Sequence, residues 1–306
     1  MDIYLPIAGL SVNAAFIVIL GFVVGLLSGM FGVGGGFLTT PLLIFYGIPP
    51  TVAVASAATQ ITGASVSGLM VHARRGGVDL KMGLVMIAGG VTGSIVGAVL
   101  FRLLLASGKV DVVIGALYVL ILGSIGALML KDSLVALGHV QPATPAEADA
   151  PPPRATRWVN TLPLRWRFES SGLFISPIAP FLLGVAAGLL TVFLGIGGGF
   201  ILIPAMIYVL GMPARVVIGT SLLMVLAVSA ETTMVHAITT RAVDIVLAGL
   251  LLVGGVIGAQ YGAQLTLRIK PDLLRLALAI IILLVALRML LGLAWRPDEI
   301  FSIELL

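Results

Sequence analysis

The residues in this sequence that could bind a ligand form a glycine-rich motif that occurs twice. Residues 25–41 read GLLSGMFGVGGGFLTTP, and residues 188–204 read GLLTVFLGIGGGFILIP. Each motif interrupts a long apolar run, and consecutive glycines are expected to unwind a helix there. A half-helix that begins after such a break presents unpaired backbone N–H groups and the positive end of its dipole, which both suit an anion. The motifs therefore predict a pair of half-helices that hold an anion.

Polar side chains near the motifs complete the predicted site. They lie at helical spacing on the helix expected at residues 51–72, on its counterpart in the second half, and just before each glycine break. Their hydroxyl and amide groups could donate hydrogen bonds to the anion. They could equally bond between helices, and the glycines could serve close packing alone. The predicted substrate-binding residues are Gly34, Gly35, Gly36, Phe37, Gly197, Gly198, Gly199, Phe200, Ser28, Thr191, Ser56, Gln60 and Thr220.

Three titratable residues are candidates for coupling transport to an ion. Glu231 lies well inside an apolar run, where a carboxylate is costly enough that a functional role is the default interpretation. The alternative is a structural ion pair with His236 or Arg241. His72 and His236 stand at matching helix ends beside basic turns, where an interaction with the helix dipole explains them as well as ligand contact does.

The elements that position these residues are predicted to be membrane-spanning helices. Of the 306 residues, 59% are hydrophobic and 10% are charged, and the mean hydropathy is +1.20. Soluble domains contain about 25% charged residues, so the composition predicts an all-α polytopic membrane protein. The basic residues lie in short segments between apolar runs, which indicates membrane topology and not nucleic-acid binding. The chain contains no cysteine, and we expect neither a metal site nor a cofactor.

An internal duplication organises the chain. An offset of 163 residues superposes the two glycine motifs, and after short insertions His236 matches His72 and Asp244 matches Asp79. Glycines four residues apart, at 89, 93 and 97 and again at 254, 258 and 262, are expected to pack helices closely. The predicted domains are a first transmembrane repeat (1–130), a Pro/Ala-rich linker with a basic-aromatic surface segment (131–172) and a second transmembrane repeat (173–306).

The orientation of the repeats depends on how each broken segment is threaded. Residues 14–46 would span roughly 50 Å as one helix, against a hydrocarbon core of about 30 Å. A single crossing gives each repeat four spans and parallel halves. A segment that folds back at the glycines, or that crosses the membrane twice, followed by three spans, gives inverted halves. Basic residues favour inversion, with roughly 12 inside and 5 outside, against roughly 11 and 6 for parallel halves.

The repeated G-x-GGGF-x₃-P signature resembles the TauE/SafE family of sulfite exporters. It runs from Gly32 to Pro41 and from Gly195 to Pro204, and a Gly-x-Pro sequence ends each broken segment. The Arg-Gly-Gly-x-Asp turn at 75–79 also fits, whereas residues 240–242 of the second repeat read Thr-Arg-Ala and depart from it. The resemblance covers nearly the whole chain outside the linker. It implies transport of small sulfur anions such as sulfite or organosulfonates.

The expected function is therefore secondary transport, with export by alternating access around the two glycine motifs. The alternatives are another small anion, such as thiosulfate or a carboxylate, and a non-transporting membrane subunit that assembles or anchors a complex. Enzyme activity is not expected, because the sequence lacks a His-Glu-x-x-His motif, a close acid pair and an ATP-binding Gly-x₄-Gly-Lys-Ser/Thr loop. We expect a multi-pass protein of a bacterial inner membrane. Its expected partners are the lipid bilayer and a sulfite or sulfonate anion, and the sequence is compatible with a homodimer.

Overall fold

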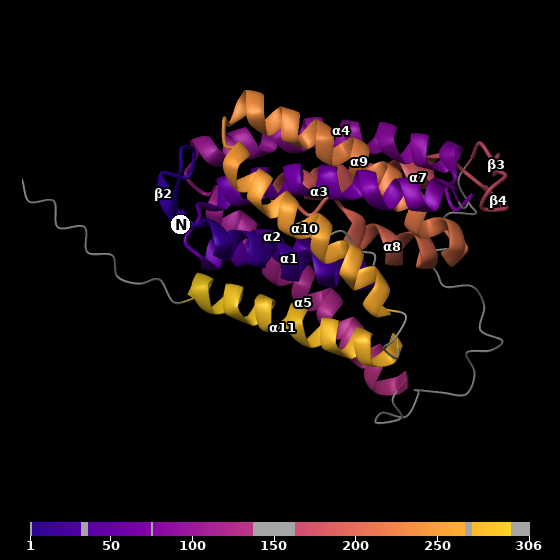
Figure 1. Cartoon of the computed structure of the whole chain (residues 1–306). Helices are drawn as coiled ribbons and strands as arrows, with labels where there is room; N and C mark the ends of the chain where they lie inside the picture. The colour runs from indigo at the N-terminus through magenta and orange to yellow at the C-terminus, as the bar shows by residue number, and fades with distance from the viewer. Residues whose placement is uncertain (1, 32–35, 75, 137–162, 267–270, 295–306) are drawn as a thin grey trace, which may run out of the picture.

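The computed structural model of the chain describes residues 2–31, 36–74, 76–136, 163–266 and 271–294 (Figure 1). Gly34, Gly35 and most of the expected linker lie outside the described residues. The described part consists of helices and two short β-hairpins, so the predicted all-α fold class is confirmed. The helices are α1 (Ala14–Phe31), α2 (Gly36–Phe45), α3 (Pro50–Arg74), α4 (Leu80–Ala106), α5 (Val110–Ala136), α7 (Ile178–Leu194), α8 (Gly199–Tyr208), α9 (Ala214–Thr239), α10 (Ile245–Thr266) and α11 (Pro271–Ala294), and the hairpins are β1 (Asp2–Leu5) with β2 (Leu10–Asn13) and β3 (Trp166–Phe168) with β4 (Leu173–Ile175).

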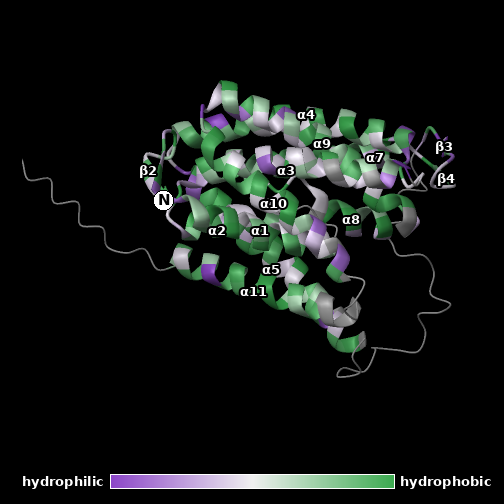
Figure 2. Ribbon diagram, viewed as in Figure 1, coloured by the Kyte–Doolittle hydropathy of each residue, from purple (hydrophilic) through white to green (hydrophobic). Residues whose placement is uncertain are grey.

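Within the described residues, six helices are long and apolar enough to cross a membrane: α3, α4, α5, α9, α10 and α11. A helix of 22 residues such as α10 is about 33 Å long, and one of 27 residues such as α4 is about 40 Å long, so each can span a hydrocarbon core of about 30 Å. Hydrophobic residues dominate along these helices (Figure 2). The protein is therefore a multi-pass membrane protein.

Helices of the two halves pack in matching pairs. Helix α1 lies along α10, and its counterpart α7 lies along α4. Glycines allow both contacts, because a Cβ atom on Gly25 would lie 2.2 Å from the Gly255 carbonyl oxygen, and one on Gly188 would lie 2.0 Å from the Gly90 carbonyl oxygen. The glycines that are spaced four residues apart also lie at close helix contacts. A Cβ on Gly93, for example, would lie 2.0 Å from the carbonyl oxygen of Val185. Their predicted role in close helix packing is confirmed.

The first broken segment folds back on itself. The N–H of Asn13, just before α1, donates to the hydroxyl of Tyr46, just after α2, over 3.3 Å. The rings of Phe16 and Tyr46 stack with their centroids 4.8 Å apart. In the second half, Ile175 before α7 and Met212 after α8 belong to one buried cluster. Helices α1 and α2 therefore begin and end, respectively, at the same end of the bundle.

The two hairpins lie at opposite ends of the helical bundle (Figure 1). We call the end with β1 and β2 the N-side end, and the end with β3 and β4 the linker-side end. The N-side hairpin contacts the turn before α10, where Ile7 N–H donates to the Asp244 carboxylate over 3.1 Å. The linker-side hairpin contacts the turn before α4, where Ser171 N–H donates to the Asp79 carboxylate, also over 3.1 Å. The helices that lead into these two turns, α9 and α3, therefore end at opposite ends of the bundle.

Candidate functional site

The two glycine motifs meet inside the bundle. A Cβ atom on Gly36, the first residue of α2, would lie 2.6 Å from the carbonyl oxygen of Gly195 and 3.0 Å from the Cα of Ile196. The start of α2 therefore touches the break between α7 and α8. Ile61 of α3 also faces both motifs, because it would meet a Cβ atom on Gly36 and one on Gly197.

The break between α7 and α8 consists of backbone that favours glycine. Gly195, Gly197 and Gly198 have φ angles of +63°, +69° and +74°, a region that costs other residues about 1–2 kcal/mol each. Helix α8 begins after Gly198, whose carbonyl accepts the N–H groups of Ile201 and Leu202 at 3.1 and 2.9 Å. Among hydrogen bonds that join described residues, none uses the amides of residues 196–200. These amides are the orphan donors expected at a helix start.

At the carbonyl end of α7, in contrast, two carbonyls accept hydrogen bonds from side chains of other helices. The Val192 carbonyl accepts a hydrogen bond from His236 Nε2 over 3.1 Å, because a carbonyl oxygen can only accept. The Leu194 carbonyl accepts from Thr40 Oγ1 over 3.1 Å and from the hydroxyl of Tyr118. The Val192 and Leu194 carbonyls are therefore paired, whereas the amides of residues 196–200 have no partner among the described residues. An anion, or another hydrogen-bond acceptor, is the ligand that completes such a site.

A polar chain links α2, α3 and α10 beside the break. The hydroxyl of Thr39 donates to Gln60 Oε1 over 3.0 Å, and Gln60 Nε2 donates to the Leu251 carbonyl over 3.4 Å. Gln60 is buried, and both the oxygen and the nitrogen of its amide form hydrogen bonds within the protein. Thr191, also buried, donates to the carbonyl of Ala187 in its own helix over 2.7 Å. The side chains of Gln60 and Thr191 therefore form hydrogen bonds to other groups of the protein in this structure.

Three residues near the break were not predicted from the sequence. They are Thr39, Thr40 and Tyr118. A difference between the two glycine motifs could have revealed the threonines, because Leu202 and Ile203 stand at their positions in the second copy. Two adjacent hydroxyls that one copy alone carries indicate a specific hydrogen bond rather than a shared fold requirement.

Two of the predicted binding residues lie at the ends of the bundle. Ser56 Oγ accepts the N–H of Asp244 over 3.3 Å, and Thr220 Oγ1 accepts the N–H of Asp79 over 2.9 Å. The two aspartates, both 1% exposed, cap α10 and α4 and also hold the hairpins. Ser56 and Thr220 therefore belong to matching end structures, and we leave them out of the site at the break. The sequence placed them at the site because the polar stripe runs along the whole helix. Spacing alone does not show which turn of that helix faces the centre of the bundle.

The candidates for coupling occupy three different surroundings. The Glu231 carboxylate, half-buried on α9, accepts a hydrogen bond from Ser94 Oγ of α4. The alternative of an ion pair with His236 is wrong, because the two ring nitrogens of His236 contact the Val192 carbonyl and the Thr240 hydroxyl. No ion pair joins Glu231 to Arg241 among the described residues either. His72, half-buried in the last turn of α3, accepts the N–H of Gly77 on its carbonyl over 3.0 Å.

The remaining predicted residues lie close to the breaks. The side chain of Phe37 is 1% exposed at the start of α2, and Ser28 is half-buried in the last turns of α1. Gly199 begins α8, and the side chain of Phe200 lies outside the described part of the chain, as do Gly34 and Gly35.

Two cavities in the described part of the chain lie away from the α7–α8 break. One cavity of about 240 Å³ lies between α2, α5 and α11, and another of about 370 Å³ lies between α1 and α2. At the break itself, a Cβ atom on Gly197 would lie 2.8 Å from Ile61 and 2.9 Å from Val225. Apolar side chains of α3 and α9 therefore pack against the backbone of Gly197.

The chain is similar in sequence to a known family of membrane proteins. The family described as "Sulfite exporter TauE/SafE" matches residues 17–289. A probable membrane transporter protein of Xylella fastidiosa is 29% identical over 280 residues, which cover 90% of this chain and 93% of that protein. The probable membrane transporter protein YunE of Bacillus subtilis is 25% identical over 283 residues, which cover 90% of this chain and 96% of that protein.

A plant protein, Sulfite exporter TauE/SafE family protein 6 of Arabidopsis thaliana, is 42% identical over 52 residues, which cover 17% of this chain and 12% of that protein. No solved structure matches the chain. The family match spans both glycine motifs and extends into α11, the last membrane-length helix of the described residues. The chain belongs to the TauE/SafE family of sulfite exporters and is a membrane transporter.

Proposed function

We propose that this protein is a secondary transporter that exports small sulfur-containing anions, such as sulfite or organosulfonates, by alternating access around the glycine breaks. The observation that carries the proposal is the polarity of the α7–α8 break. The Val192 and Leu194 carbonyls beside it accept hydrogen bonds from His236, Thr40 and Tyr118, while the amides of residues 196–200 stay unpaired among the described residues. Unpaired buried amides are costly, so a bound oxyanion that accepts their hydrogen bonds has a large favourable contribution to its binding.

We further propose that the repeats are inverted in the membrane. Each hairpin directly precedes the first helix of its repeat, and the hairpins lie at opposite ends of the bundle (Figure 1). A two-fold axis in the membrane plane relates halves arranged in this way, and transporters built so bind substrate where the repeats meet. The linker-side end is assigned to the cytoplasm, because among the basic residues whose side chains are described it carries five, namely Arg74, Lys81, Lys131, Arg165 and Arg167, against four elsewhere, namely Arg102, Lys109, Arg241 and Arg288.

The proposed direction follows from charge. An anion that moves outward through an inside-negative potential gains about 2.3 kcal/mol per charge per 100 mV. Export therefore needs no ATP-binding loop, and the sequence contains none. Glu231 with its Ser94 partner is the proposed place where a proton could couple to this movement.

Flux through the purified protein in liposomes tests the proposal. Liposomes with an inside-negative potential, loaded with sulfite, sulfoacetate, thiosulfate or acetate, should release the first two anions faster than protein-free liposomes do. Release of thiosulfate or acetate alone would assign a different anion. A folded protein that releases none of the four would point to a non-transporting subunit instead.

A further inference from the structure

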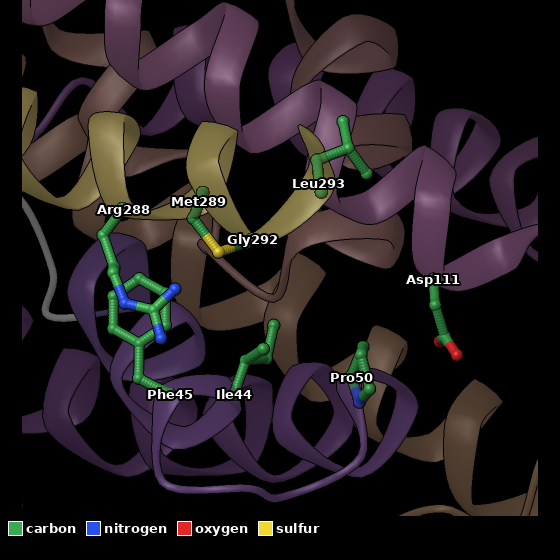
Figure 3. A pocket seen from close by; sticks show the side chains of 9 residues that line it. Ile44, Phe45, Pro50, Asp111, Arg288, Met289, Gly292 and Leu293 are labelled. Atoms are coloured by element: carbon green, nitrogen blue, oxygen red, sulfur yellow. The ribbon is translucent and has the colours of Figure 1, made fainter. Parts of the chain in front are cut away.

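A charged cavity lies at the N-side end of the bundle, between α2, α5 and α11 and apart from the glycine breaks (Figure 3). Its volume is about 240 Å³. Arg288 of α11 and Asp111 of α5 are its two charged lining residues, and Figure 3 shows them on opposite sides of the cavity. The rest of the wall is made of apolar side chains, a proline and two glycines. A ligand held here would meet a positive group on one side and a negative group on the other.

Arg288 is built into this wall and not simply exposed to lipid. It lies within the apolar span Leu276–Ala294, where an arginine is unfavourable unless its guanidinium reaches water or a partner. The guanidinium carbon stands 5.2 Å from the centre of the Phe45 ring, a cation–π contact across to α2. A Cβ atom on Gly292 would lie 3.5 Å from Arg288 Nη1, so the glycine leaves room beside the charge.

An apolar groove adjoins the charged cavity. It has a volume of about 370 Å³, and apolar and aromatic side chains of α1, α2 and the following turn line it. Phe45 lines both spaces, so one ring separates the charged cavity from the groove. The groove extends along α1 from Phe16 to Val23, away from the N-side end and toward the middle of the membrane-length helices. Together the two spaces have the shape and polarity of an amphiphile that stands upright in a bilayer leaflet.

We propose that this composite surface binds a phospholipid with a phosphoethanolamine headgroup. Its phosphate contacts Arg288, its ammonium contacts Asp111, and one acyl chain lies in the groove beyond Phe45. A headgroup without an ammonium leaves the carboxylate of Asp111 facing a phosphate, which is unfavourable. A small free anion leaves both Asp111 and the groove without a partner. The cavity is also smaller than the roughly 300–1,000 Å³ of sites for whole drug-sized molecules, which suits a headgroup alone.

Native mass spectrometry of the purified full chain, titrated with phosphatidylethanolamine or phosphatidylglycerol, tests the site. Phosphatidylethanolamine should bind more tightly. Arg288→Gln should weaken binding of both lipids, by about tenfold for one charge-assisted contact. Asp111→Asn should weaken phosphatidylethanolamine alone and remove the preference. Arg102→Gln, which removes an exposed cation of α4 at the same end, is the control and should change neither affinity.

A second pair of variants fills space without changing charge. Gly292→Leu should block the cavity and abolish the preference for phosphatidylethanolamine, whereas Gly123→Leu, where a Cβ atom meets nothing within 4 Å, should leave it unchanged. Equal binding of the two lipids by the unmodified protein would overturn the proposal. So would displacement of the lipid by millimolar sulfite, since that outcome assigns the cavity to a free anion.

Discussion

Gly198→Ala separates the binding role of the α7–α8 break from its role in folding. Gly198 has a φ angle of +74° and directly precedes the first residue of α8. An alanine that keeps this angle costs about 1–2 kcal/mol. Its Cβ atom would also lie 3.1 Å from the Cβ of Ala187, which is a tight contact. Rotation of the backbone to a negative φ angle relieves the strain but turns the following amides away from their present direction.

The expected loss of affinity comes from those amides. A hydrogen bond to a charged group contributes about 1.5–3 kcal/mol, and each 1.4 kcal/mol is tenfold in affinity. Misdirecting one amide should therefore weaken sulfite binding by about tenfold to a hundredfold. Gly211→Ala is the matched control, because Gly211 has a φ angle of +71° and a Cβ atom there meets nothing within 4 Å. Both variants should lose about 1–2 kcal/mol of stability from the positive φ angle, with a further loss in Gly198→Ala from the contact with Ala187, but only Gly198→Ala should lose affinity.

Calorimetric titration of sulfite into each purified variant, with thermal unfolding of the ligand-free protein, measures both quantities. Flux from liposomes should fall in the same order as affinity. If Gly198→Ala and Gly211→Ala bind sulfite equally well, the amides at the start of α8 do not hold the anion, and the glycines serve the fold alone.

Three further predictions address coupling, the ends of the bundle and topology. Glu231→Gln should abolish the dependence of flux on a pH gradient while sulfite still binds, because an amide cannot carry a proton; unchanged pH dependence in a folded variant would exclude coupling through this residue. Asp244→Ala leaves three backbone N–H groups at the N-side end without their acceptor. It should lower the free energy of unfolding by roughly 3 kcal/mol or more. The control Glu169→Ala, on an exposed turn, should cause little change in the melting temperature. Single cysteines at Ala73 and Arg241, which the chain allows because it contains no other cysteine, should react with an impermeant maleimide from opposite faces of the membrane; reaction from one face would contradict the inverted arrangement.

The asymmetry between the two glycine motifs bears on how such a transporter moves. Thr40 and Tyr118 hold the Leu194 carbonyl at the end of α7, and they come from α2 and α5 of the other repeat. His236 of the second repeat holds the neighbouring Val192 carbonyl. The end of α7 is thus tied to both repeats at once. A movement of one repeat against the other must lengthen these hydrogen bonds or replace them with others. We therefore expect the break to open where these hydrogen bonds form.

The glycine ladders set a limit on that movement. Where Gly25 meets Gly255 and Gly188 meets Gly90, the helix backbones touch with no side chain between them. Backbone contacts of this kind are expected to keep the two helices together while allowing one helix to slide a small distance along the other. The pairs α1–α10 and α4–α7 are therefore expected to move as units, each made of one helix from either half.

The sequence by itself determined the membrane class, the duplication and the helices. Composition decided the class, because a chain with 10% charged residues cannot cover a soluble surface. Periodicity and repeated glycines decided where helices run and break, since backbone preference is a local property of each residue. The alignment of Asp79 with Asp244 likewise came from the sequence, although no role could be attached to it.

Only the tertiary structure decided which polar groups share a site. Ser56 and Gln60 lie one helical turn apart on the same stripe, yet Ser56 contacts the turn before α10 and Gln60 contacts Thr39 beside the break. The partners of the α7 carbonyls come from residues 40, 118 and 236, which are far apart in the chain. Hydrogen bonds of this kind depend on distances between helices. Those distances are set by close glycine packing across the whole bundle and not by any local pattern of residues.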